Sequence, residues 1–77
     1  MDILDLIREI SLALEISIDQ ISAETTSEMI DEWDSLGQIS ILARLDVVYD
    51  DITEKVPELA SALSVSEIYK ILRDTGY

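Results

Sequence analysis

The sequence predicts an all-α fold, a small antiparallel four-helix bundle with three main helices, one short helix and a long loop between the first and second helices. Three observations support this fold class. Apolar residues recur at steps of three and four in three segments, which is the period of a helix. Serine and threonine clusters and a single proline separate these segments. The length of 77 residues allows one domain, so we expect a single domain over residues 1–77.

The first helix is predicted from Asp2 to about Glu15, with Asp2 as its N-cap. Its expected apolar face comprises Ile3, Leu4, Ile7, Ile10 and Leu14. Residues 16–34 then form the long loop, in which Ile18 and Ile21 are the expected apolar anchors. A loop of this length in a small domain is usually functional or carries a short helix of its own.

The second helix is predicted from Ser35 to about Asp50, and it carries two apolar stripes. The stripe expected to face the core comprises Ile41 or Leu42, Leu45, Tyr49 and Ile52. The other stripe comprises Leu36, Ile39, Ala43 and Val47. A domain of this size cannot readily bury both sides of one helix, so we expect the second stripe to be offered to a partner.

The C-terminal part of the chain predicts two more helices. Pro57 suits the first turn of a short helix over Pro57–Ala62. Ser64 and Glu67 have the spacing of a capping box, which opens a last helix that extends to about Thr75. The residues of this helix that we expect to point inward are Val65, Ile68, Ile71 and Leu72.

The composition excludes several function classes. Seventeen acidic and five basic residues give a formal net charge of −12, so the chain should be repelled by nucleic acid and by anionic membranes. The absence of Cys and His excludes disulfides, thiolate metal sites and a serine triad. No metal site is predicted, because the run Asp31–Asp34 lacks the spacing of a calcium loop. The longest uncharged stretch is too short to span a bilayer, and without a basic or apolar leader we expect a cytoplasmic protein.

One serine stands where the acidic loop becomes a helix. A hydroxyl at this position is expected to be accessible to solvent, beside free backbone amides and the positive end of the helix dipole. A phosphodiester attached to Ser35 would be favourably placed there. The spacing is equally that of an ordinary N-cap formed by Asp34 or Ser35, and the local sequence leaves both interpretations open.

The motif Asp34-Ser35-Leu36, with an apolar helix behind it and the short Pro57 helix and amphipathic last helix beyond, resembles acyl carrier proteins and the wider phosphopantetheine-binding carrier family. The resemblance covers essentially the whole chain. It implies that a phosphopantetheinyl transferase attaches 4′-phosphopantetheine from coenzyme A to Ser35. The thiol of this arm would carry an acyl group as a thioester, and the carrier itself would not be an enzyme.

The resemblance also implies residue roles and partners. Asp34 is the acid before the serine, which is expected to help position the transferase and the arm. The second apolar stripe and Asp46 match the surface that carriers offer to acyl-loading and acyl-transferring enzymes with basic patches. Loop charges that could meet such patches include Glu28, Asp31 and Glu32. We expect a monomer.

Several residues depart from the fatty-acid carriers of this family. They are Trp33, Ser40, Arg44, Val47 and Val48. Trp33 is typical of stand-alone carriers of specialised bacterial pathways related to polyketide, fatty-acid or lipid synthesis, and it serves either recognition or packing at the helix junction. Three other hypotheses remain: an aminoacyl or peptidyl carrier, an acidic adaptor or decoy that presents carboxylates to a basic protein, and a cation-responsive switch.

Overall fold

The computed structural model describes residues 2–77, and the regular structure of that range is helical apart from an isolated antiparallel bridge between Thr26 and Ser64. The predicted all-α class is therefore confirmed. The elements in chain order are α1 Ile3–Leu14, η1 Ile18–Gln20, η2 Ser27–Met29, α2 Ser35–Val48, α3 Ile52–Lys55, η3 Pro57–Ser61 and α4 Val65–Asp74, where η marks a 3₁₀ helix.

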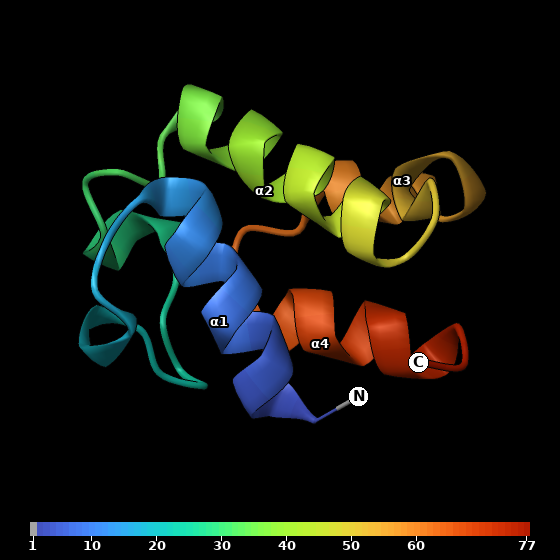
Figure 1. The fold of residues 1–77 in the computed structure, drawn as a ribbon, viewed down its shortest axis with the longest axis horizontal. Coiled ribbons are helices and arrows are strands. Elements are labelled where there is room, and N and C mark those ends of the chain that lie inside the picture. The colour runs from blue at the N-terminus through green and yellow to red at the C-terminus, as the bar shows by residue number, and fades with distance from the viewer. Residues whose placement is uncertain (1) are drawn as a thin grey trace.

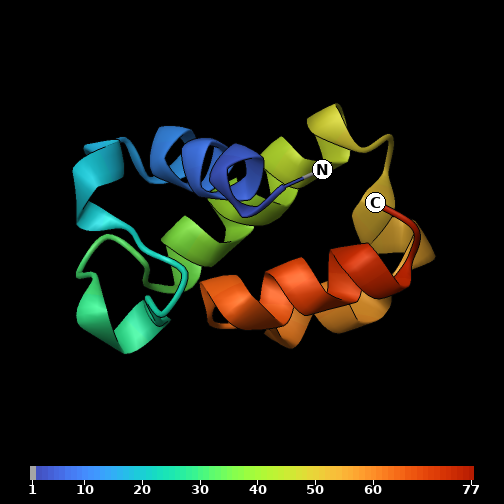
Figure 2. The same ribbon diagram turned by 90° about the horizontal axis from the view of Figure 1, so that it is seen from below.

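The three longer helices do not form a regular antiparallel array. Helix α1 crosses α2 obliquely, whereas α2 and α4 run in the same general direction (Figures 1 and 2). Both α1 and η3 contact α2 and α4, so these two elements connect α2 to α4. The hydrophobic core lies between these four elements. Its fully buried large side chains are Leu6, Ile10, Ile41, Leu45, Ile52, Leu59, Val65, Ile68 and Leu72.

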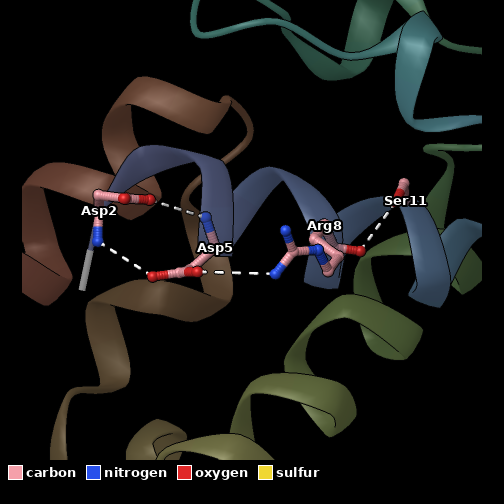
Figure 3. A network of polar contacts seen from close by, with 4 residues as sticks. All are labelled: Asp2, Asp5, Arg8 and Ser11. Carbon is pink, nitrogen blue, oxygen red and sulfur yellow. Dashed lines mark hydrogen bonds and ion pairs between the residues drawn. The ribbon is translucent and has the colours of Figure 1, made fainter.

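Helix α1 begins with a reciprocal cap (Figure 3). The Asp2 carboxylate accepts a hydrogen bond from the backbone N–H of Asp5 at 3.1 Å, and the Asp5 carboxylate accepts one from the backbone N–H of Asp2 at 3.3 Å. Asp5 also lies 3.7 Å from the Arg8 guanidinium. The predicted apolar face needs one correction, because Leu4 is exposed and Leu6 is buried in its place.

The long loop contains two short 3₁₀ helices, as its length suggested. Ile21 is buried as expected, but Ile18 is exposed, so its prediction as an anchor was wrong. The backbone of the loop is tied to the segment before α4. Ser27 N–H donates to the Leu63 carbonyl at 2.8 Å, and Val65 N–H donates to the Thr25 carbonyl at 3.0 Å. These bonds hold the loop against the C-terminal third of the chain.

Helix α2 ends two residues earlier than predicted, and the cause is local. Asp50 and Asp51 both adopt the left-handed conformation, with φ of 55° and 57°. Asp tolerates this conformation better than most residues, because its short polar side chain can bond locally. The two aspartates therefore turn the chain into α3, a short helix that the sequence did not predict.

The last two helices agree closely with the prediction. The predicted Pro57–Ala62 helix is the 3₁₀ helix η3, with Pro57 in its first turn. Ser64 caps α4 by accepting from the Glu67 N–H at 3.1 Å, which is one half of the expected capping box. After α4, the Tyr77 ring meets the Tyr49 ring edge to face at 4.9 Å between centroids. Burial, with the charges of Asp5 and Glu9 nearby, raises the pKa of the Tyr49 hydroxyl above its usual value.

Candidate functional site

Ser35 is the first residue of α2, and its side chain is exposed. Within residues 2–77 its hydroxyl makes no hydrogen bond. The N-cap is Asp34, whose Oδ1 accepts from the Gly37 N–H at 2.8 Å. The local sequence allowed either Asp34 or Ser35 to cap this helix, and in the structure the cap is Asp34. The Ser35 hydroxyl is left accessible at the positive end of a 14-residue helix.

Gly37 allows the loop to fold tightly onto the start of α2. A Cβ atom at this position would lie 2.1 Å from the carbonyl oxygen of Glu32 and 2.9 Å from Cδ2 of Leu14. Both distances are shorter than real contacts of a Cβ atom, so only glycine fits without displacement of the loop. This close contact holds the loop against the first turn of α2, which carries Ser35. The role of Gly37 was not predicted from the sequence.

A buried hydrogen-bond network lies beneath Ser35. The Trp33 indole N–H donates to Oε1 of Gln38 at 2.7 Å, and both side chains are buried. Nε2 of Gln38 donates to the Ala62 carbonyl at 2.9 Å and lies 3.3 and 3.4 Å from the carbonyls of Ala60 and Leu59. Trp33 therefore packs at the helix junction, which was the second of its two predicted roles. Gln38 was missed, although a glutamine between two apolar stripes was a signal that could have identified it.

An open groove of about 520 Å³ runs beside Ser35. Its lining residues are Ser27, Trp33, Asp34, Ser35, Gln38, Ile39, Ala60 and Leu63. A second hollow of about 310 Å³ adjoins it, because Ser27 and Leu63 line both. Apart from Leu63, the second hollow is lined by hydroxyl-bearing residues and two glutamates, Glu28 and Glu67. Ser35 thus lines the first of two adjoining surface depressions.

The second apolar stripe of α2 is open to solvent, as predicted. Leu36, Ile39 and Val47 are exposed by 74%, 62% and 82%, and Ala43 is also exposed. The opposite face is buried through Ile41 and Leu45. The exposed stripe therefore runs along α2 from the turn that carries Ser35, and Ile39 belongs both to the stripe and to the lining of the groove.

Two charged residues of α2 have partners inside the protein. Asp46 accepts at both carboxylate oxygens from Thr53, at 2.8 Å from the backbone N–H and 2.8 Å from the hydroxyl. Arg44 donates to Glu9 of α1 at 2.6 Å. Asp46 therefore holds α3 onto α2, and its predicted role toward partners stays a prediction. The ion pair of Arg44 with Glu9 connects α2 to α1.

The carboxylates of the long loop are differently placed. The side chains of Glu28, Asp31, Glu32 and Asp34 are exposed, and none takes part in the ion pairs found within residues 2–77. Across the same residues, no group of three or more acidic side chains is arranged to hold a metal ion. Nor does any helix in the described part of the chain have both the length and the apolar character to span a bilayer.

Comparisons of the chain with protein-family models, with curated proteins and with solved structures found no match. Function at this site is therefore inferred from its geometry and chemistry.

Proposed function

We propose that this chain is an acyl carrier protein with 4′-phosphopantetheine attached to Ser35. It would deliver an acyl group, held as a thioester, to biosynthetic enzymes of a specialised bacterial pathway in the cytoplasm. The observation that carries the proposal is the placement of an exposed, unbonded serine hydroxyl at the start of a long helix, between an open groove and an exposed apolar stripe. The proposal includes the four-helix bundle that is typical of the carrier family.

The chemistry of attachment fits this position. Ser35 Oγ would form a phosphodiester bond to coenzyme A phosphorus, its proton passing to a base of the transferase while adenosine 3′,5′-bisphosphate departs. The amides of the first turn of α2 and the positive end of its dipole favour the added negative charge. Asp34 holds that turn through Gly37, and its exposure leaves the carboxylate within reach of the transferase and its magnesium ion.

The surface around Ser35 suits short-lived contacts with several partner enzymes. The stripe of Leu36, Ile39, Ala43 and Val47 offers apolar contact area, and the loop carboxylates surround it with negative charge. Charge of this kind mainly raises association rates and sets orientation, which suits a protein that must also leave each partner quickly. A flexible arm then raises the effective concentration of the acyl group at the partner's active site.

Incubation with coenzyme A, magnesium and a broad-specificity phosphopantetheinyl transferase tests the proposal. Intact mass spectrometry should show one added phosphopantetheine on the wild-type chain and none on Ser35→Ala. Ser40→Ala is the matched control, because Ser40 is an exposed serine on the same helix and should leave modification intact. Circular dichroism should show the same helix content in all three proteins. Modification at another residue would overturn the assignment of Ser35.

The acidic adaptor is the second candidate. It is favoured by one observation, the exposed loop carboxylates that no basic side chain pairs within the described residues. It gives no role to the accessible hydroxyl of Ser35. If several transferases leave the wild-type chain unmodified, the adaptor becomes the better explanation. An aminoacyl or peptidyl carrier would pass the same test, and a mass spectrum of the protein from its native host would distinguish these from an acyl carrier.

A further inference from the structure

The contact between α2 and η3 directly beneath Ser35 is closed by a polar bridge. Gln38 lies one helical turn after Ser35, and its amide spans from the Trp33 indole to the backbone carbonyls of the η3 segment. Its side chain leaves no donor or acceptor of this bridge unpaired, since no buried side-chain polar atom in the described residues lacks a partner. An alkyl chain that entered the core here would have to break these bonds, which is costly in a buried site.

The other approach to the core from Ser35 is closed by packing. The first turn of α2 lies directly on the loop backbone at Glu32 and on the Leu14 side chain, with no room even for a Cβ atom on Gly37. Behind this contact the core is made of fully buried leucine and isoleucine side chains, including Leu45 and Ile68. A protein interior of this kind has no free volume for an added chain without displacement of its side chains.

The open space lies outside. The groove beside Ser35 has the exposed side chains of Ile39 and Leu63 along it, and it continues into a hollow lined by serine and threonine residues and two glutamates. A long alkyl chain in such an open depression, whose apolar side chains are interspersed with hydroxyl and carboxylate groups, would stay in contact with water. A short acyl group with hydroxyl or amino substituents could instead find hydrogen-bond partners there.

We infer that the acyl group of this carrier stays outside the helical core, in the surface groove between Ser35 and Leu63, and that it is short and polar. This inference rests on the proposed function and names the substrate class of the same site. The Trp33–Gln38 bridge is the structural feature that keeps the acyl group out of the core. Hydroxyacyl and aminoacyl groups are both short and both carry a substituent that can form hydrogen bonds in the groove, so the experiment includes both.

The test uses a single attachment point that needs no transferase. Because the chain contains no cysteine, Ser35→Cys provides one thiol, which is modified with a methyl or an octyl methanethiosulfonate. The octyl chain should not raise the unfolding temperature above that of the methyl adduct. Methyl NMR signals of Leu45 and Ile68 should not move, while those of Ile39 and Leu63 should. The same adducts on Ser40→Cys provide the baseline for an alkyl chain on the surface of this helix.

Burial of the octyl chain would be evident, because the extra methylenes would raise the unfolding temperature by roughly 10 °C or more. Such a rise, with movement of the Leu45 and Ile68 signals, would overturn the inference.

The second arm of the test loads the phosphopantetheine form with acetyl, hydroxybutyryl, alanyl and octanoyl groups. The hydroxyacyl or the aminoacyl form should shift backbone signals of Ser27 and Leu63 more than the octanoyl form does. An octanoyl group that shifts core signals instead would overturn the substrate class. Failure of the transferase to act would count against the proposed function and leave the result with the Ser35→Cys adducts standing.

Discussion

At the scale of single residues, the position of Ser35 depends on neighbours that have no reactive group. Gly37 has no side chain, so the loop backbone can pack directly against the helix. Asp34 caps the first turn of that helix. Gln38 connects the same turn to the η3 segment. The serine is therefore held by three contacts of the first helical turn while its own hydroxyl stays unbonded.

We expect Gly37→Ala to destabilise the protein although alanine is the better helix former. The Cβ atom would overlap the Glu32 carbonyl oxygen, and a clash in a well-packed site costs about 1–3 kcal/mol, more than the helix propensity gained. Urea unfolding measures the change. Ser40→Ala, on the exposed side of the same helix, should stay within about 0.5 kcal/mol of wild type. Equal stability of Gly37→Ala and wild type would mean that the loop does not lie against α2 as described.

At the scale of elements, α2 has one buried face and one exposed face, and both of its charged residues have partners inside the protein. Asp46 and Arg44 contact α3 and α1 respectively. Val47 contacts solvent and is the most exposed large apolar residue of the helix. Substitutions on this helix should therefore separate stability from partner reactions.

Asp46→Ala should destabilise the junction between α2 and α3. It removes two hydrogen bonds to a carboxylate and leaves Thr53 without its acceptor, at a cost of about 1–2 kcal/mol for this half-buried pair. Chemical denaturation with a double-mutant cycle on Asp46 and Thr53 measures the coupling. Asp74→Ala is the control, because the ion pair of Asp74 with Lys70 is exposed at 3.2 Å, lies away from this junction and should contribute little. Zero coupling between Asp46 and Thr53 would contradict the structural role of this pair.

Val47→Glu should leave the helix intact and slow reactions with partner enzymes. The side chain is 82% exposed, so the free energy of unfolding should change by less than about 0.5 kcal/mol. Loss of an apolar contact in the interface should lower the transferase rate by roughly fivefold or more. Arg44→Glu differs, because it would place two carboxylates together at Glu9 and lower stability as well. A fall in helix content with Val47→Glu would show that the stripe belongs to the core.

At the scale of the whole molecule, the dominant feature is unbalanced negative charge. The chain has only five basic residues, and Arg8, Arg44, Lys55 and Lys70 form ion pairs with Asp5, Glu9, Asp50 and Asp74, respectively. The carboxylates of the long loop take no part in these ion pairs, so the pairs do not neutralise their charge. A small core must therefore hold the chain together against electrostatic self-repulsion, which is strongest at low salt.

Added salt should therefore raise the unfolding temperature. Going from about 0.01 M to 0.15 M ionic strength shortens the screening length from ~30 Å to ~8 Å, which weakens repulsion across the molecule. We expect a rise of roughly 5 °C by thermal circular dichroism. The same salt change near pH 4.1, the sequence pI, should have a much smaller effect, because the net charge is then close to zero. An unchanged melting point at pH 7 would show that self-repulsion is unimportant.

Local physics explains which parts of this structure could be predicted from the sequence. Helix periodicity identified α1, α2 and α4 to within about two residues of each end, because the spacing of apolar residues and the caps at Asp2 and Ser64 act over short stretches of chain. The exposure of the Leu36–Val47 stripe followed from the same reasoning, since a small domain can bury only one face of a helix.

Contacts between distant parts of the chain decided the rest. The exposure of Ile18, the pairing of Asp46 with Thr53 and of Arg44 with Glu9, and the bridge from Gln38 to Ala62 all depend on which segments meet in space. Periodicity carries no information about those partners. It was therefore the tertiary structure that left the capping to Asp34, kept the Ser35 hydroxyl free and closed the core beneath it, because each outcome requires a backbone or side chain brought to that turn by the fold.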